Sequence, residues 1–294
     1  MSEMQMVGDS FRLGYRAQRH WDGAMAGAFF CGELGAGLFL AAMVLEVVPG
    51  MLLGLLLTGV GKPILHFAHL GAPGKSWRAI LRPDRSWTSR GLIAIVVFCG
   101  AGLLHTVNAA TGDVIPFDRA WQVLAGAAAL VVLTYQGFAM SHSTAIALWS
   151  TAMMPIAGLL YGLAGGVIVS LLLRSGAAGP LLMVAQGLLL AVGVMLFCLL
   201  YAAQHGSPGG RLSAELLFRG RYARWFHGVV VAVGLVLPTL AFWLGGGGPI
   251  NLAIAAAGVL AGFLAFRILV FKAGVYEPVM DFSALLGDSG KAIP

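Results

Sequence analysis

Charged side chains are scarce in this chain: only 10% of its 294 residues are Asp, Glu, Lys or Arg, whereas 59% are hydrophobic. In a soluble protein about a quarter of the residues are charged, because the folded surface must be covered with polar groups. The composition therefore excludes an ordinary soluble globular domain, and lipid is the expected solvent for most of the chain.

Cysteine is also rare, and the three cysteines, Cys31, Cys99 and Cys198, each stand alone inside an apolar run. Iron–sulfur clusters and structural zinc sites need several Cys or His ligands at close spacing, and the sequence has no such cluster. We therefore expect no iron–sulfur cluster, no metal site and no disulfide framework in this chain. The cysteines are interpreted as small packing residues.

Long apolar runs are what the chain does contain. A transmembrane helix needs roughly 20 apolar residues to cross a hydrocarbon core about 30 Å thick, and eight segments meet this length. The sequence therefore predicts an all-α polytopic membrane protein with about eight transmembrane helices, which could form two four-helix bundles. The predicted spans are 22–46, 50–70, 91–111, 119–139, 144–172, 179–203, 223–244 and 249–271.

Basic residues gather before the first run, after the last run, and in the second and sixth connections between runs. The positive-inside rule then puts both termini in the cytoplasm and the chain in the inner, cytoplasmic membrane. We expect an N-terminal segment 1–21, a transmembrane domain 22–271 and a tail 272–294. The net charge of +6 belongs to these loops and does not indicate nucleic acid binding. The basic positions are Arg12, Arg16, Arg19, Lys75, Arg78, Arg82, Arg85, Arg90, Arg211, Arg219, Arg221, Arg224, Lys272 and Lys291, against Arg119 and Arg174 on the other side.

Ionisable groups at membrane depth are costly, so each is a candidate for function. Glu33 lies about 16 Å along the first helix, near the middle of the bilayer. A carboxyl group there could take up and release a proton, or could be a neutral group hydrogen-bonded between packed helices. Arg267 could extend toward the basic side or pair with Glu33, and Lys62 raises the same question. His105 is a second candidate for proton transfer, nearer the opposite face.

Tyr135 lies near the end of the fourth run, on the same membrane side as the basic loops. A tyrosine hydroxyl can donate a hydrogen bond to a quinone carbonyl while its ring lines an apolar cleft, although interfacial tyrosines are more often belt residues. Two histidines at equal depth on different helices could instead ligate a b-type haem, and His66 with His227 is the best such pair. Structural histidines are the alternative.

Four stretches of the chain, taken in order, resemble the polysulfide reductase NrfD family. The first run carries the sequence GELGAG, and the second connection runs from His69 through Trp77 and Arg82 to Ser89 and Arg90. The other stretches are 133–137, which ends the fourth run, and 216–220, which leads to 225–226 and 234–238. The resemblance covers most of the chain in consistent order.

The resemblance implies a membrane subunit that binds a quinone, either menaquinone or ubiquinone, and contains no haem. It implies two partners: a ferredoxin-like four-cluster iron–sulfur subunit and a molybdenum bis-guanine-dinucleotide catalytic subunit. Tyr135 matches the family's quinone-contacting tyrosine. Where the family has a quinone-contacting histidine and asparagine in the first helix, this chain has Gly27 and Ala24, so His20, His69, Glu33 and Trp87 become the other candidates.

The basic second connection, with Arg78, Arg82, Arg85 and Arg90, is the expected docking surface for the iron–sulfur subunit, although topology alone could explain its charge. The sequence thus favours a membrane anchor that exchanges electrons with that subunit and does not itself act on the terminal substrate. Two alternatives stay open: a haem b cytochrome anchor, and a proton-coupled secondary transporter that uses Glu33 with Arg267.

Overall fold

The computed structural model describes residues 15–112, 114–177 and 179–278. Within these residues eight helices are long and apolar enough to cross a membrane, which confirms the predicted all-α polytopic fold. Arg12, Lys291 and most of the predicted N-terminal segment and tail lie outside the described residues. The eight candidate spans are Gly23–Val44, Val48–His69, Trp87–Thr111, Asp118–Ser141, Met153–Leu173, Gly179–Gly206, Ala223–Gly245 and Pro249–Lys272.

Two of the spans are composite, because each contains a π-helical segment, of 5 residues in one and 11 in the other. The second consists of α2 (Val48–Leu56), the π-helical η1 (Leu57–Gly61) and α3 (Lys62–His69), and the seventh of α9 (Ala223–Trp225), the π-helical η3 (Phe226–Val236) and α10 (Leu237–Gly245). The other elements are β1 (Arg16–Ala17), α1 (Gly23–Val44), the 3-10 helix η2 (Pro73–Ile80), α4 (Trp87–Thr111), α5 (Asp118–Ser141), α6 (Met153–Leu173), α7 (Gly179–Gly206), α8 (Pro208–Phe218), α11 (Pro249–Lys272) and β2 (Val275–Tyr276).

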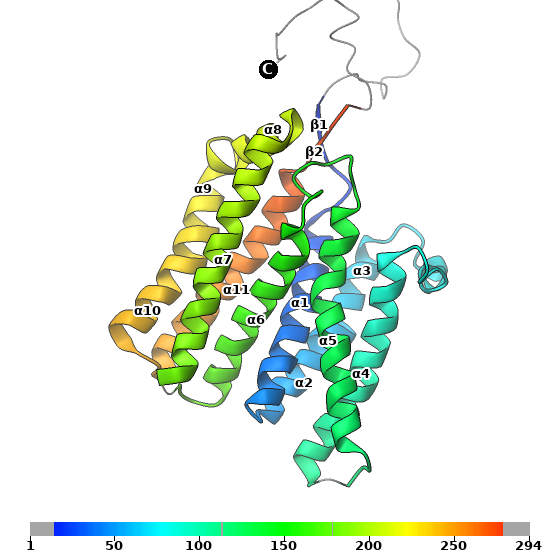
Figure 1. Ribbon diagram of the computed structural model, residues 1–294, viewed down its shortest axis with the longest axis vertical. Helices are drawn as coiled ribbons and strands as arrows, with labels where there is room; N and C mark the ends of the chain where they lie inside the picture. Colours follow the sequence, from blue (N-terminus) through cyan, green and yellow to red (C-terminus); the bar gives the residue numbers. More distant parts are fainter. Residues whose placement is uncertain (1–14, 113, 178, 279–294) are drawn as a thin grey trace, which may run out of the picture.

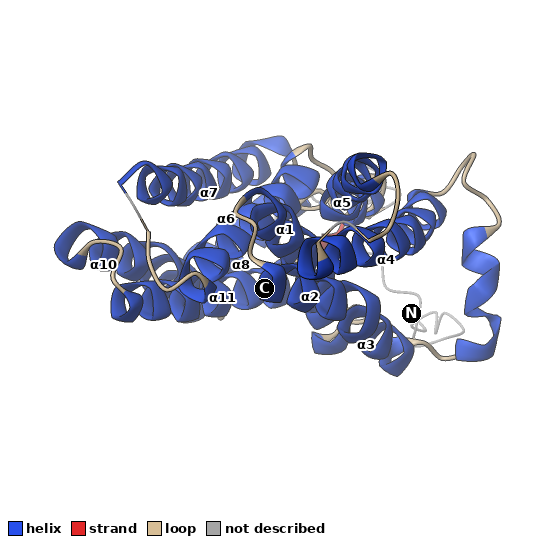
Figure 2. Cartoon of the chain, turned by 90° about the horizontal axis from the view of Figure 1, so that it is seen from below, coloured by secondary structure: helices blue, strands red, loops and turns tan. Residues whose placement is uncertain are grey.

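The spans form two groups that meet at α1 and α6 (Figure 1). Helices α2 to α5 lie on one side of α1, and α7 to α11 lie on the other side, as the view from below also shows (Figure 2). Helix α1 packs on α6, α11, α5, α2 and α3, so it is the central helix of the molecule. Side chains that α1 directs inward are therefore shielded from lipid on every side.

Small residues allow the two groups to approach closely. A Cβ atom added to Gly37 on α1 would lie 2.1 Å from the carbonyl oxygen of Gly162 on α6, and one on Gly166 would lie 2.4 Å from Gly37. Backbone contact of this kind is the usual way in which membrane helices gain packing energy, since lipid supplies no hydrophobic drive for association. Of the three glycines in the GELGAG stretch, Gly37 thus serves the α1–α6 contact, whereas Gly32 and Gly35 face the second span.

Polar caps fix where α1 and α4 begin. The Asp22 carboxylate accepts a hydrogen bond from the backbone N–H of Met25 at 3.0 Å, and the Ser86 hydroxyl accepts one from Ser89 at 3.3 Å. Such side chains satisfy backbone donors that the first turn leaves without a partner. Gly112 ends α4 with φ of 82°, a conformation that glycine adopts without strain.

The fifth predicted span, 144–172, begins nine residues too early. Helix α6 begins at Met153, and the residues before it form turns that pack under the ends of neighbouring helices. The buried Trp149 donates its indole N–H to the carbonyl oxygen of Val270 at 3.0 Å, and Ile146 pairs with Tyr276. The stretch before α6 is therefore a buried loop, and hydropathy alone cannot distinguish a short buried apolar loop from the start of a helix.

Both ends of the described chain lie on one side of the bundle, because the number of spans is even. Strand β1 pairs with β2 in an antiparallel two-stranded sheet. Gln18 donates to the carbonyl oxygens of Trp21 and Phe271, at 2.8 and 2.9 Å, and so ties the start of α1 to the end of α11. We call this side, which also carries η2 and α8, the basic end.

Candidate functional site

Four polar side chains from four helices meet inside the bundle, and we call them the polar core. They are Glu33 of α1, Lys62 of α3, Gln136 of α5 and Arg267 of α11, each no more than 1% exposed. Charged groups are rarely buried in a membrane protein unless they pair with one another or serve a function. The polar core is therefore the first candidate for a functional site.

Glu33 and Arg267 form a buried ion pair. The Arg267 Nε atom donates to Glu33 Oε2 at 2.8 Å, and Nη2 lies 2.7 Å from the same oxygen. The sequence left open whether Arg267 extends toward the basic side or pairs with Glu33, and it pairs. Since α1 and α11 are the first and last spans, this bond joins the two ends of the transmembrane chain.

Lys62 enters the polar core from the point where the π-helical η1 gives way to α3. Its ammonium donates to Gln136 Oε1 and to the carbonyl oxygen of Ala28, the latter at 3.4 Å. Gly32 provides the room, because a Cβ atom there would lie 2.9 Å from Lys62 Cδ and 3.1 Å from Nζ. Gln136 in turn donates to the carbonyl oxygen of Phe29 at 3.2 Å.

The polar core holds one acid and two bases, so its formal charge is +1 when all three groups are ionised. Within the described part of the chain, Glu33 Oε1, Arg267 Nη1 and the Tyr161 hydroxyl are buried without a hydrogen-bond partner. Buried polar atoms are normally satisfied by protein groups or ordered water. The core therefore has unused hydrogen-bonding capacity and an excess of positive charge.

Tyr135 borders the polar core on its α4 side. It precedes Gln136 in α5 and is 4% exposed. Its ring packs against the backbone of α4 at Gly91, where an added Cβ atom would lie 2.1 Å from the ring. The Lys62 ammonium lies 5.3 Å from the centre of this ring. Tyr135 is thus the candidate residue that links the core to the α4–α5 surface.

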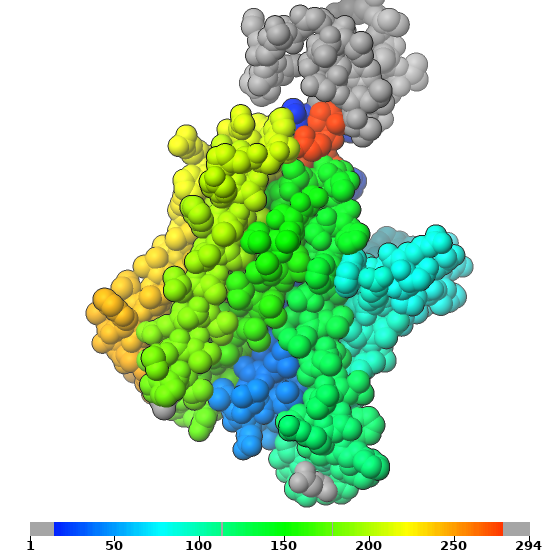
Figure 3. All heavy atoms as spheres, in the orientation of Figure 1, coloured from blue at the N-terminus to red at the C-terminus, as the bar shows by residue number. Residues whose placement is uncertain are grey.

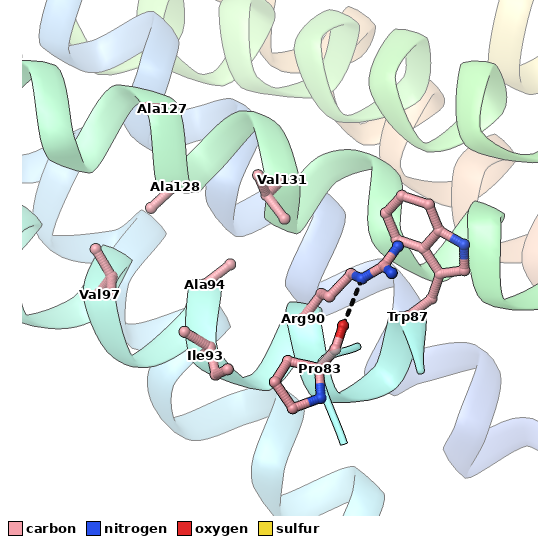
Figure 4. Close-up of a pocket in the computed structure, with 9 residues that line it drawn as sticks. All are labelled: Pro83, Trp87, Arg90, Ile93, Ala94, Val97, Ala127, Ala128 and Val131. Atoms are coloured by element: carbon pink, nitrogen blue, oxygen red, sulfur yellow. Dashed lines mark hydrogen bonds between the residues drawn. The ribbon is translucent and has the colours of Figure 1, made fainter. Parts of the chain in front are cut away.

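An open apolar groove of about 460 Å³ runs along the lipid-facing seam of α4 and α5 (Figure 4). At its basic end the Trp87 ring stacks on Phe138 with centroids 4.3 Å apart, and the Arg90 guanidinium lies 4.6 Å from the Trp87 ring. Its lining residues are Pro83, Trp87, Arg90, Ile93, Ala94, Val97, Ala127, Ala128 and Val131.

Tyr135 lies one helical turn from the groove on α5 and is not one of its lining residues. Val131 of the groove and Tyr135 are four residues apart on α5, so they share one face of that helix. Arg90 donates to the carbonyl oxygens of Pro83 and Asp84, at 2.8 and 3.1 Å, and its side chain is thereby held at the mouth of the groove. Of the candidates from the sequence, Trp87 lines the groove, and Tyr135 packs on α4 one helical turn further along, at Gly91.

His69 and His20, two other candidates, lie at the surface of the basic end and not in the groove. His69 Nδ1 lies 3.1 Å from Asp22, and His20 is exposed. The hydrogen bond from the backbone N–H of Met25 lowers the pKa of the Asp22 carboxyl below its ordinary value of 3.8, and the His69 ring lowers this pKa further. His69 thus contacts Asp22, the residue that caps the N-terminus of α1.

His105 lies at the opposite end of α4, as the sequence indicated. Its Nδ1 is 2.8 Å from Asp118, which also accepts from Asn108 at 3.1 Å. Asp118 begins α5 and Tyr135 lies 17 residues further on, a separation of about 25 Å along the helix. His105, predicted to transfer protons, therefore lies at the far end of α5 from Tyr135.

The two histidines of the haem hypothesis also lie apart. His66 is on α3 and packs near Phe29, with ring centroids 6.5 Å apart, whereas His227 is exposed on η3 and bonds to the carbonyl oxygen of Phe218 at 2.9 Å. Helix α3 packs on α1 on one side of the molecule, and the segment from α9 to α10 packs on α11 on the other (Figures 1 and 2). The fold therefore provides no shared site for this pair.

The segment with the predicted docking arginines stands out from the body of the molecule (Figure 3, cyan). Arg78, Arg82 and Arg85 are exposed there, and Arg85 pairs with Asp84 at 3.2 Å. Arg90 differs, because it is half-buried and bonded to its own loop. Three of the four arginines thus present their charge to the surrounding medium.

Residues 27–207 match the protein family described as DMSO reductase anchor subunit (DmsC). The chain belongs to this family. A search of curated proteins gave no match. The matched region includes most of α1, Lys62, Tyr135 and the groove, whereas Arg267 and α11 lie beyond it.

As a DmsC family member the chain is a multi-pass membrane anchor of a DMSO reductase-type molybdopterin oxidoreductase, with catalytic and iron–sulfur subunits as its partners. That part of the expectation drawn from the NrfD resemblance is confirmed. The DmsC anchor also contains site residues that the sequence did not assign, namely Lys62, Gln136 and Tyr161. A lysine inside an apolar run was the available signal for Lys62, but its partners come from distant segments.

Proposed function

We propose that this anchor subunit binds a quinone or quinol at the basic end of the α4–α5 groove and exchanges electrons with the iron–sulfur subunit of its complex. The observation that carries the proposal is the position of Tyr135, one helical turn beyond an apolar groove that opens to lipid. A quinone dissolved in the bilayer could enter from the side, without crossing water.

The residues present fit such a molecule. An isoprenoid chain is apolar, and the walls of the groove are mainly alanine, valine and isoleucine side chains, with Trp87 at one end. Binding sites of this kind combine apolar walls with a few polar groups that fix orientation. The Tyr135 hydroxyl is the donor we assign to a quinone carbonyl, and the rings of Trp87 and Phe138 flank the headgroup.

A bound quinone supplies exchange of two electrons and two protons with its surroundings. We assign one proton-holding role to Glu33, because its Oε1 atom is buried without a partner and its helix also contacts α5. Gln136, which accepts a hydrogen bond from Lys62, is the residue next to Tyr135 in α5. A proton role for His105 would concern the opposite membrane surface, where it pairs with Asp118.

We further propose that the iron–sulfur subunit docks on the basic end and that this end faces the cytoplasm, with both termini on that side. The exposed Arg78, Arg82 and Arg85 support an acidic partner surface, and the positive-inside rule supports the orientation. Docking at the basic end would put the partner on the same side as Tyr135 and Trp87. The short separation that electron exchange requires follows from this arrangement.

Replacing Tyr135 with Phe tests the proposal, with Tyr201→Phe on the exposed face of α7 as the matched control. Loss of one hydrogen bond to the quinone predicts a roughly tenfold lower kcat/KM for quinol in the intact complex. Activity driven by a reduced viologen dye, which supplies the catalytic subunit directly, should stay unchanged in both variants.

Two outcomes would contradict the proposal at different levels. Wild-type kcat/KM in Tyr135→Phe would remove Tyr135 from the site. A purified three-subunit complex that neither binds nor oxidises any quinol would refute quinone binding altogether, and a haem spectrum in that preparation would favour the cytochrome alternative.

A further inference from the structure

Among the described residues, Lys62 is the base of the polar core that forms no ion pair with a carboxylate; its hydrogen bonds go to Gln136 and Ala28. One carboxylate oxygen of Glu33 contacts two nitrogen atoms of the Arg267 guanidinium. In the described part of the chain, Glu33 is also the one carboxylate whose charge acts on Lys62. Because one acid serves two bases, one positive charge is uncompensated inside the bundle when all three groups are ionised.

The local backbone geometry directs the Lys62 side chain into the polar core. The π-helical η1 immediately precedes Lys62, and single π-turns in helices are frequent at functional sites. Pro63 follows Lys62 and lacks the N–H that a regular helix would use there, which accounts for the local change in helical geometry. Gly32 then leaves a channel along α1 in which the lysine side chain lies.

The ammonium reaches the Tyr135 side of the core. It lies 5.3 Å from the centre of the Tyr135 ring and 5.5 Å from that of Phe29, and it bonds to Gln136, the residue next to Tyr135. Arg267, the other base, is paired with Glu33 and lies 5.5 to 6.0 Å from the centres of the Phe29, Phe263 and Phe266 rings. The base without an ion-pair partner in the described ranges is therefore Lys62, whose ammonium lies beside the Tyr135 ring.

We propose that Lys62 makes the site at Tyr135 selective for negative charge on the bound headgroup. This inference rests on the proposed quinone site and adds to it a positioning residue that acts by charge. In a low-dielectric interior a fixed ammonium a few ångströms away stabilises an anion far more than it would in water. Lys62 would thereby favour the anionic forms of a quinone-type ligand over neutral forms of the same shape.

A pair of matched ligands tests charge selectivity directly. 2-Hydroxy-1,4-naphthoquinone is an anion at neutral pH, whereas 2-methoxy-1,4-naphthoquinone has nearly the same shape and stays neutral. The dissociation constants of both would be measured on the intact complex in mild detergent, for the wild type, Lys62→Met and Lys62→Arg. Lys272→Met, which removes an exposed lysine at the end of α11, is the control.

Lys62→Met should weaken binding of the anionic ligand roughly tenfold or more and leave binding of the neutral ligand within about twofold. Lys62→Arg should restore most of the selectivity, and Lys272→Met should match the wild type. If Lys62→Met does not assemble, Gly32→Ala provides a second test. It keeps the charge and displaces the ammonium, so it should reduce the same ratio of affinities.

The outcomes separate this inference from the proposed function. Equal weakening of both ligands would reduce Lys62 to a packing residue, and an unchanged ratio of affinities would exclude the charge effect. Both results would overturn the inference while quinone binding stands. Failure of the wild-type complex to bind either ligand would instead count against the quinone site itself.

Discussion

Arg267 and Glu33 meet at a single oxygen atom: Nε and Nη2 of the guanidinium lie 2.8 and 2.7 Å from Glu33 Oε2, with both side chains fully buried. A parallel two-oxygen contact, the most common strong geometry for such a pair, would have used Glu33 Oε1 as well. The observed geometry leaves Oε1 available to a further partner. The pair thus fixes the first and last spans and keeps one carboxylate oxygen for chemistry.

Removing one partner of this pair should be strongly destabilising. Arg267→Met leaves a buried carboxylate without its cation, which typically costs about 3–5 kcal/mol. The free energy of unfolding should fall by that order, and the double variant with Glu33→Gln should recover part of the loss. Unfolding of the detergent-solubilised subunit in a denaturant titration would measure both effects.

Arg119→Gln is the matched control for that experiment, because Arg119 is exposed and donates to Gln122. Its substitution should change the free energy of unfolding by less than about 1 kcal/mol. If Arg267→Met is as mild as Arg119→Gln, the buried pair contributes little to the fold and its role must be functional only.

Gly91→Ala should disturb quinol turnover without touching a polar group. The added Cβ atom would lie 2.1 Å from the Tyr135 ring, so the ring must move. We expect a rise of roughly tenfold or more in the KM for quinol, because misplacement of a positioning group by about 1 Å is costly. Gly100→Ala lies on the same helix with no atom within 4 Å and should behave as the wild type. Equal KM values for the two variants would show that Tyr135 does not position quinol.

Gly37→Ala should separate α1 from α6. The new Cβ atom would lie 2.1 Å from the Gly162 carbonyl oxygen, which is backbone and cannot rotate away. We expect a clear loss of thermal stability and of assembled complex in the membrane. Gly187→Ala on α7, where no atom lies within 4 Å, is the control. Wild-type melting of Gly37→Ala would mean that the two helices can move apart freely.

The Asp22 cap predicts a small pH dependence of stability. Its pKa is lowered in the folded protein by the Met25 N–H, so its contribution is full above its ordinary value of 3.8 and is lost as the pH falls through the lowered pKa. Asp22→Asn keeps a capping side chain but cannot titrate. The wild type should be more stable than Asp22→Asn near pH 6, and the difference should vanish on acidification. Because Asp22 is largely exposed, the difference should stay below about 1 kcal/mol. Parallel thermal melting curves at all pH values would contradict this assignment.

Hydropathy and charge placement predicted the eight spans to within a few residues at most ends, because crossing a bilayer requires a long apolar run whatever packs against it. The exception is instructive. The predicted fifth span included the stretch before α6, yet Trp149 in that stretch donates its indole N–H to Val270, more than 100 residues away. Only the packed structure contains that partner.

The candidate site divides in the same way. Glu33 and Tyr135 could be singled out from their residue type and depth, since an acid in lipid or a tyrosine beside a basic loop needs an explanation. Lys62 could be noticed but not placed, because its position depends on a π-turn, on the absence of a side chain at Gly32 and on Gln136 from α5. His20 and His69 had the right depth but face the surface.

The sequence by itself determined that lipid surrounds most of the chain, how many spans cross it and which end of the bundle is basic. The first two follow from the transfer free energy of each apolar segment, and the third follows from the charge of the loops. Only the tertiary structure decided that Glu33 pairs with Arg267, that Lys62 lies beside Tyr135, and that α4 and α5 leave a groove open to lipid. These features join residues up to 234 positions apart, and no local pattern encodes which helix faces become neighbours.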